Sequence, residues 1–304
     1  MACVCFKPYH PRKEKRIQLN AIQEIIDTCT ANNDLDSLSS REIYYKLLAK
    51  NLVKSGAENN GEYDKVADLI RDARMGGLID WDVIVDRNRE TSIPYYRNSI
   101  EDAIESVADL YKLDRMRNQE VYLEVMIEKM AIYDVVDKIT YPYTIPLTGN
   151  KGNSSKTVLY DTSKRLVKEQ AKGKKCVILY IGDHDPSGLM MIDNIAETLK
   201  LMGVNDFNFE LRPIALTYEQ VLKYKLPPND VKTKDKNAPN YIKQFGEYSW
   251  ECDALPAKVL QDILEKEIKA TVDMKKYTEI LELEQKERER ISDIVTILKR
   301  AEMI

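Results

Sequence analysis

Apolar residues in the first part of the chain recur at the spacing of an amphipathic helix. Over Ile17–Cys29 they fall three or four residues apart, which predicts a first helix. Ser39, with Glu42 three residues later, has the form of a capping box, in which each residue satisfies a backbone N–H of the other. This pattern predicts that a second helix begins here and runs to Leu52.

A third helix and a pair of strands are predicted next. Over Glu62–Met75 the apolar residues again lie on one side, and Gly76 and Gly77 are typical of a helix end. Weak alternation over Leu78–Val85 predicts the strands of a β-wing. Three short helices followed by a hairpin are typical of a winged-helix domain, a module that contacts DNA in some proteins and other proteins elsewhere.

The period of the pattern changes after residue 118, where strands and helices are predicted to alternate. The run over Cys176–Ile181 is apolar without interruption, as a strand covered on both faces must be. Alternating strands and helices predict an α/β fold with a mostly parallel sheet. The predicted elements are a strand ending at Glu128, a helix over Met130–Ile139, a strand over Tyr141–Leu147, a helix over Lys156–Gln170, a strand over Cys176–Ile181, a helix over Ser187–Met202, a strand over Phe207–Ile214 and a helix over Tyr218–Leu226.

A surface loop followed by helices is predicted for the end of the chain. Pro227–Gln244 is rich in Pro, Asn, Asp and Lys, which is typical of a loop. Leu255–Ile304 has a heptad-like apolar trace that Glu284 and Glu287 interrupt, so we expect a packing or dimer helix rather than a long coiled coil. The expected organisation is a winged-helix domain at residues 1–112, an α/β domain at 113–254 and a helical extension at 255–304.

Composition and charge narrow the classes of function. A chain of 304 residues with 43% apolar content can bury one large core or two modest ones, and we expect two. It has no stretch of about eighteen uncharged apolar residues and no signal-peptide core, so we expect a soluble, cytoplasmic protein without a membrane partner. Because the net charge is −4, DNA binding would depend on local basic patches. Arg71, Arg74 and Lys151 are candidates, with a solvated charged face as the common alternative.

Carboxylates gather where two predicted strands end. Glu128 ends one strand, and Asp183 and Asp185 follow another, two residues apart, so that both point to one side while His184 points away. Binding sites of open α/β sheets form at this edge, and Mg²⁺ prefers oxygen ligands. With 5 cysteines and 2 histidines, a zinc site is not indicated. The sequence therefore predicts a magnesium site for phosphate chemistry, with helix capping by the aspartates as the alternative.

These residues also carry a resemblance to a known domain. Glu128 at a strand end and the run Asp183–Gly188, which reads Asp-His-Asp-Pro-Ser-Gly, are similar to the Toprim domain of topoisomerases, primases and related nucleases. The resemblance implies a Rossmann-like fold in which Glu128, Asp183 and Asp185 hold Mg²⁺, with Mn²⁺ as an alternative. Glu124 faces the same way on the same strand and is an alternative to Glu128.

Two tyrosines on the second predicted helix form the other candidate feature. Helical spacing puts Tyr44 on the apolar stripe and places Arg41 beside Tyr45 on its flank. Tyr44 is therefore predicted to be a core residue and Tyr45 to be exposed. Arg41 could stabilise a phenolate or hold a phosphate, as attack by Tyr45 on a phosphodiester would require. The alternative is that Tyr45 packs against the wing in a structural role.

The order of these motifs resembles that of the topoisomerase VI A subunit, a type IIB enzyme, and of the meiotic double-strand-break transesterase. The resemblance implies that Tyr45 attacks DNA and becomes joined to its 5′ end, with Arg41 and Glu128 as the other catalytic residues. It also implies a homodimer, in which the metal lies across the interface from the tyrosine, and a separate ATPase subunit of the B type for strand passage.

Three functions remain open from the sequence. The first is DNA cleavage by Tyr45, the second is a Toprim endonuclease with water as the nucleophile, and the third is a non-catalytic DNA-binding or assembly subunit. Glu251 and Asp253 form a further acidic pair that could extend the metal site, but Asp253 is predicted to cap the following helix.

Overall fold

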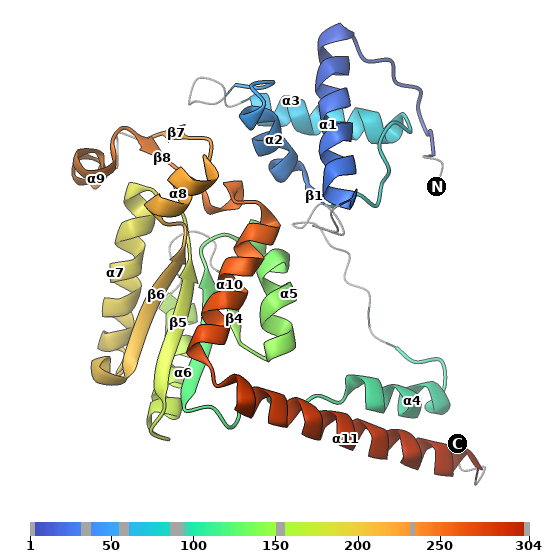
Figure 1. The fold of residues 1–304 in the computed structure, drawn as a ribbon, viewed down its shortest axis with the longest axis vertical. Coiled ribbons are helices and arrows are strands. Elements are labelled where there is room, and N and C mark those ends of the chain that lie inside the picture. The colour runs from blue at the N-terminus through green and yellow to red at the C-terminus, as the bar shows by residue number, and fades with distance from the viewer. Residues whose placement is uncertain are drawn as a thin grey trace.

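The chain folds into an N-terminal helical part and a C-terminal α/β part, and two further helices extend to one side (Figure 1). The computed structural model describes residues 4–31, 38–54, 61–85, 94, 96–149, 156–231 and 235–300. Each part has its own cluster of buried apolar residues, so the expectation of more than one core is confirmed.

The three predicted helices of the N-terminal part are confirmed as α1 (Lys13–Ala31), α2 (Ser40–Ala49) and α3 (Glu62–Met75). The predicted capping box begins α2: Ser39 Oγ accepts a hydrogen bond from the Glu42 N–H at 3.2 Å, and Glu42 Oε2 accepts one from the Ser39 N–H at 2.7 Å. Because these two bonds satisfy donors that a helix leaves free, they fix where α2 begins. The start of the helix in turn sets the position of Tyr45.

The predicted wing is not seen over Leu78–Val85. The strand found there, β2 (Ile84–Val85), pairs in parallel with β1 (Leu38–Ser39), so these residues do not form a hairpin. Leu38 and Ile84 are both buried in the core of the helices, which favours pairing between them. Residues 86–93 lie outside the described part of the chain, and the winged-helix assignment stays a prediction.

A parallel sheet forms the centre of the α/β part, as predicted. Its four strands lie in the order β4-β3-β5-β6, and all neighbours are parallel. Because parallel neighbours bring all the carboxyl ends to one edge, the loops after β3 and β5 lie next to each other. The strands are β3 (Val121–Ile127), β4 (Leu147–Gly149), β5 (Lys175–Ile181) and β6 (Phe209–Ala215).

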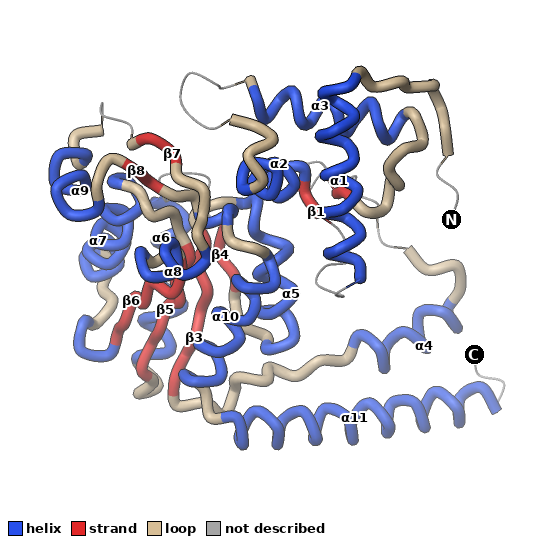
Figure 2. The backbone as a smooth tube through the Cα atoms, turned by 45° about the horizontal axis from the view of Figure 1, so that its top comes forward, coloured by secondary structure: helices blue, strands red, loops and turns tan. Residues whose placement is uncertain are grey.

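Helices cover both faces of this sheet, as Figure 2 shows. Leu123, Val125 and Ile127 pack on the side of α5 and α10, whereas Met126 packs on the side of α6 and α7. This division follows from the alternation of side chains along a strand. The helices are α5 (Tyr133–Tyr143), α6 (Lys156–Gln170), α7 (Pro186–Leu201), α8 (Tyr218–Tyr224) and α10 (Ala257–Thr271), with short 3₁₀ turns at Met130–Ile132, Asp206–Asn208 and Cys252–Ala254.

Two of the predicted elements are wrong. The strand expected over Tyr141–Leu147 begins only at Leu147, as β4, because α5 continues to Tyr143, whose ring packs on Tyr277 with centroids 4.9 Å apart. The loop expected over Pro227–Gln244 contains β7 (Asn229–Asp230) and much of α9 (Ala238–Phe245); β7 pairs with β8 (Tyr248–Ser249). In both segments, contacts with distant residues select a structure that local composition does not favour.

The two helices that extend from the body are α4 (Ile100–Leu110) and α11 (Met274–Arg300), which lie side by side (Figure 1). Glu284, which interrupts the predicted heptad trace, is only 2% exposed. Its carboxylate binds Arg115 at 2.7 Å and Arg288 at 2.9 Å. The interruption is therefore a buried ion-pair network that ties α11 to the segment after α4.

Replacing Glu284 with alanine is expected to lower the free energy of unfolding by about 3 kcal/mol, because it strands the Arg115 guanidinium in a largely buried place. Urea unfolding followed by circular dichroism measures the change. Glu282→Ala is the matched control: it removes an exposed carboxylate from the same helix and should change stability by less than about 0.5 kcal/mol. Equal effects of the two substitutions would contradict a stabilising role for the network.

Candidate functional site

The structure brings Glu128 and Asp183 together at the carboxyl edge of the sheet. Glu128 directly follows β3, and its backbone N–H donates to the Ile181 carbonyl at 2.9 Å, at the end of β5. Its Oε2 accepts hydrogen bonds from the Asp183 N–H at 2.9 Å and from the Tyr180 hydroxyl at 3.4 Å. A Cβ at Gly182 would lie 2.6 Å from this same oxygen, so the close approach of Glu128 requires glycine there.

The alternative ligand Glu124 lies elsewhere. Its side chain is buried on β3, where it accepts hydrogen bonds from Arg165 at 2.7 and 2.8 Å and from the Tyr122 hydroxyl at 2.7 Å. These bonds use both carboxylate oxygens. Glu124 therefore has a structural ion pair, and Glu128 is the glutamate that faces Asp183.

The residues of the Asp-His-Asp run have three different roles. Asp183 Oδ1 accepts from the Cys252 N–H at 2.8 Å, and its Oδ2 binds Lys129 Nζ at 2.8 Å. His184 points away as predicted: it is 3% exposed, and its Nδ1 lies 2.8 Å from the Tyr241 hydroxyl in an aromatic cluster. Asp185 caps α7 by accepting from the Gly188 N–H at 2.6 Å. The capping alternative therefore describes Asp185 but not Asp183.

Other negatively charged side chains lie close to the Glu128 carboxylate. Burial, and then the charges of Asp183 and Asp185, raise the pKa of Glu128 to about 7. Such crowding, with oxygen donors only, is the chemistry that suits Mg²⁺. Among the described residues, however, no three His, Cys, Asp or Glu side chains are already arranged around one cation position. These carboxylate oxygens are the type of ligand that Mg²⁺ binds. In this structure the ammonium of Lys129 forms an ion pair with Asp183.

Tyr45 lies in the opposite environment to the one predicted. Its side chain is buried, at 8% exposed, whereas Tyr44 is half-buried and donates to the Lys54 carbonyl at 3.2 Å. The reason is that the C-terminal part covers the flank of α2, which helical periodicity within α2 cannot reveal. The Tyr45 hydroxyl donates to Glu251 Oε2 at 2.9 Å across this contact. Tyr45 thus contacts a carboxylate of the C-terminal part within one chain.

Glu251 and Asp253 have more contacts within the candidate site than the sequence indicated. Arg41 binds both of them, with Nη2 3.0 Å from Glu251 Oε2 and Nε 3.0 Å from Asp253 Oδ2. Asp253 lies in the 3₁₀ turn and makes no side-chain cap, since Pro256 holds the cap position of α10; the predicted capping role is wrong. In the sequence, Glu251 and Asp253 could be recognised as candidates by their spacing of two residues.

Lys129 was missed altogether, although it directly follows the predicted ligand Glu128. Its ammonium lies 2.8 Å from Asp183, 2.9 Å from Glu251 and 3.5 Å from Asp253. Burial opposes its charge, but these carboxylates outweigh burial and raise the pKa of Lys129. Lys129 is therefore the cation that links the strand-end carboxylates to those that contact Tyr45.

The protonation states around Tyr45 follow from these contacts. Burial, and then the charges of Asp253 and Glu251, raise the pKa of Tyr45 well above its usual value. Burial would also raise the pKa of Glu251, but Lys129 and Arg41 hold it at about 2. At neutral pH the tyrosine is therefore a neutral donor, and Glu251 is a charged acceptor.

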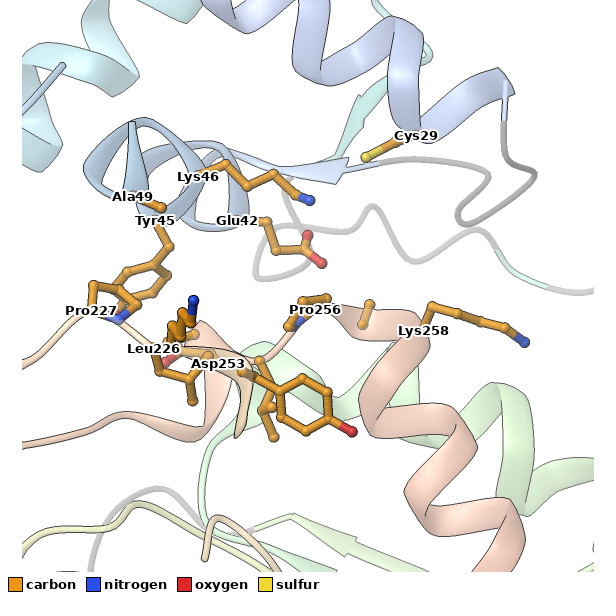
Figure 3. Close-up of a pocket in the computed structure, with 15 residues that line it drawn as sticks. Cys29, Glu42, Tyr45, Lys46, Ala49, Leu226, Pro227, Asp253, Pro256 and Lys258 are labelled. Carbon is orange, nitrogen blue, oxygen red and sulfur yellow. The ribbon is translucent and has the colours of Figure 1, made fainter. Parts of the chain in front are cut away.

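A cavity of about 160 Å³ lies beside Tyr45, between α2 and the start of α10. Figure 3 shows Tyr45 and Lys46 reaching into this region from α2, opposite Leu226 and Asp253. Lysines 225 and 258 also contribute to its lining. The cavity gives space next to the tyrosine for a group larger than a water molecule.

The two described candidate DNA-binding residues, Arg71 and Arg74, have contacts of their own. Arg71 pairs with Asp68 at 2.6 Å and with Asp72 at 3.0 Å. The Arg74 guanidinium lies 4.4 Å from the ring centre of Trp81, and burial lowers its pKa. Both arginines already have intramolecular partners, and their role in DNA binding stays a prediction. Lys151 lies outside the described residues.

No helix in the described part of the chain is long and apolar enough to cross a membrane. Comparisons with known proteins leave the resemblance to the Toprim domain and to the topoisomerase VI A subunit as a prediction. No protein-family model, no curated protein and no solved structure matches this chain.

Proposed function

We propose that this protein is a DNA-cleaving enzyme of the topoisomerase VI A type, in which Tyr45 attacks a phosphodiester. The observation that supports the proposal is the meeting of Tyr45 and Arg41 from α2 with the carboxylates beside the sheet edge. Tyr45 reaches Glu251 at 2.9 Å, and Lys129 joins Glu251 to Asp183 with distances of 2.9 and 2.8 Å. A hydroxyl nucleophile, two cations and several metal-type ligands are thereby concentrated in one place.

In the proposed reaction, the Tyr45 oxygen forms a bond to phosphorus and the bond to the 3′ oxygen breaks. The tyrosine becomes joined to the 5′ phosphate, its proton passes to a neighbouring carboxylate, and the departing 3′ oxygen takes up a proton. Arg41 and Lys129 would orient the phosphate and offset its charge. Mg²⁺, or Mn²⁺ as an alternative, would be held by Glu128, Asp183 and Asp185 and would stabilise charge on the reacting phosphate.

A covalent adduct is the product that tests this proposal. The protein is incubated with supercoiled and linear DNA plus Mg²⁺ or Mn²⁺, denatured, and examined for protein attached to 5′ ends. Attachment at Tyr45, located by peptide mapping, is the expected result. Cleaved DNA with free 5′ phosphates and no attached protein would contradict the tyrosine mechanism.

A Toprim endonuclease that uses water is the second candidate. The observation that favours it is the burial of Tyr45, whose neutral hydroxyl is hydrogen-bonded in this structure. In this scheme Tyr45 and Arg41 hold the N-terminal part against the acidic cluster, and the metal site still cleaves DNA. A non-catalytic DNA-binding or assembly subunit is the third candidate, and DNA binding without Mg²⁺ binding by calorimetry would support it.

The proposed partners are DNA, a second copy of the chain and a separate ATPase subunit for strand passage. The exposed Ile294 and Ile297 on α11 support the homodimer, because they leave apolar surface on a helix that extends from the body. Sedimentation analysis tests the dimer, and a requirement for ATP and a second protein in relaxation assays tests the ATPase partner. A cytoplasmic location belongs to the same proposal.

A further inference from the structure

Three donors from two parts of the chain converge on one oxygen atom, Glu251 Oε2. The Tyr45 hydroxyl lies 2.9 Å from it, Lys129 Nζ lies 2.9 Å from it, and Arg41 Nη2 lies 3.0 Å from it. Two cations and a hydroxyl around one anionic oxygen form the environment that a phosphate oxygen requires. Here the chain supplies that oxygen from its own carboxylate.

Each of the two cations has a second carboxylate partner besides Glu251. Lys129 is also bound to Asp183 at 2.8 Å, and Arg41 is bound to Asp253 at 3.0 Å. The side chain of Asp253 is only 6% exposed, whereas that of Arg41 is 46% exposed. Removing Glu251 would therefore leave both cations where they are, with one negative charge fewer beside them.

Glu251 is more exposed to solvent than Asp253, the other carboxylate that Arg41 contacts. Its side chain is 30% exposed, and it lies in the segment between β8 and the 3₁₀ turn, outside the packed sheet. The cavity beside Tyr45 borders this arrangement, since Tyr45 and Asp253 both line it. A side-chain rotation would open the space between the cations without disturbing the core.

We propose that Arg41, Lys129 and Tyr45 form a phosphate-binding site that the Glu251 carboxylate fills in the resting protein. A DNA phosphodiester replaces Glu251, takes its place between Arg41 and Lys129, and comes next to the Tyr45 oxygen. Glu251 thus acts as an internal competitor that keeps the nucleophile covered until nucleic acid binds. This inference rests on the proposed function for the identity of its ligand, and on the geometry alone for the existence of the anion site.

Inorganic phosphate is the probe that tests the anion site, measured by titration calorimetry in EDTA so that neither metal nor cleavage contributes. Glu251→Gln keeps the shape of the side chain and removes its charge, and phosphate should bind this variant at least about tenfold more tightly than the wild type. The glutamine of this variant still has an amide oxygen that can accept hydrogen bonds from the cations. Glu251→Ala has no such oxygen, and its gain in phosphate affinity should be at least as large.

Two further variants show whether any gain arises at this site. Glu247→Gln removes an equal charge from an exposed position four residues away and should leave phosphate affinity unchanged. Adding Lys129→Met to Glu251→Gln should cancel the gain, because one of the two cations is lost. Unchanged affinity in both Glu251 variants, or an equal gain in Glu247→Gln, would overturn the inference.

A second arm identifies the source of the phosphate group. A fluorescent duplex oligonucleotide should bind Glu251→Gln more tightly than wild type in EDTA, and inorganic phosphate should compete with it. A gain for free phosphate without one for the duplex would overturn DNA as the ligand.

The outcomes also separate this inference from the proposed function. Tyr45 adducts without any gain in affinity would leave the proposed function standing and end the inference. A gain in phosphate affinity without any Tyr45 adduct would support the anion site and contradict DNA cleavage by Tyr45.

Discussion

Tyr45→Phe is expected to abolish the covalent protein–DNA adduct, leaving less than about one thousandth of the wild-type amount. The substitution removes the attacking oxygen and its hydrogen bond to Glu251, but it keeps the ring that packs 5.5 Å from the ring of Tyr44. The expected loss is therefore chemical rather than structural. The measurement is protein covalently attached to labelled 5′ ends after denaturation, with circular dichroism to verify folding.

Tyr44→Phe provides a matched control on the same helix. It removes a hydroxyl that donates to the Lys54 carbonyl and not to Glu251, so the adduct should persist at near wild-type levels. If Tyr45→Phe still cuts DNA at the normal rate and yields free 5′ phosphates, water is the nucleophile. In that case the endonuclease proposal replaces the transesterase proposal.

Asp183→Asn should reduce metal-dependent cleavage by at least about a thousandfold. Asparagine has nearly the same shape, but it lacks the charge that pairs with Lys129 at 2.8 Å and that would help to hold Mg²⁺. Its amide oxygen can still accept from the Cys252 N–H, which the carboxylate accepts at 2.8 Å, so the local fold should survive. Initial rates of nicking and linearisation of supercoiled DNA measure the effect.

The control for this substitution is Asp193→Asn, which neutralises an exposed aspartate on α7. Its cleavage rate should match that of the wild type. Both the tyrosine and the water schemes predict loss of activity in Asp183→Asn, because both use the same metal site. Full activity in Asp183→Asn would therefore remove the metal assignment from both schemes.

Local patterns in the sequence were sufficient for much of the fold. The capping box at Ser39 predicted the start of α2, and the uninterrupted apolar run predicted the central strand β5. Helix α6 has the predicted bounds, Lys156–Gln170. In these cases the physical cause lies within a few residues: a cap satisfies nearby backbone donors, and a strand covered on both faces needs apolar side chains at every position.

Part of the candidate site also followed from local patterns. Glu128 and Asp183 meet because each follows a strand and the two strands are parallel neighbours, which brings their ends to one edge. The opposite direction of His184 follows from the alternation of side chains in extended backbone. Helical spacing likewise placed Arg41 next to Tyr45.

The sequence alone indicated the alternation of strands and helices after residue 118 and the carboxylates that follow β3 and β5, because the periodicity of each element is a local property. Only the tertiary structure decided that Tyr45 is buried and bound to Glu251, 206 positions away. It also decided that Lys129 joins Asp183 to Glu251. The physical reason is that burial and ion pairing depend on which surfaces cover each other in space, and no local periodicity records that.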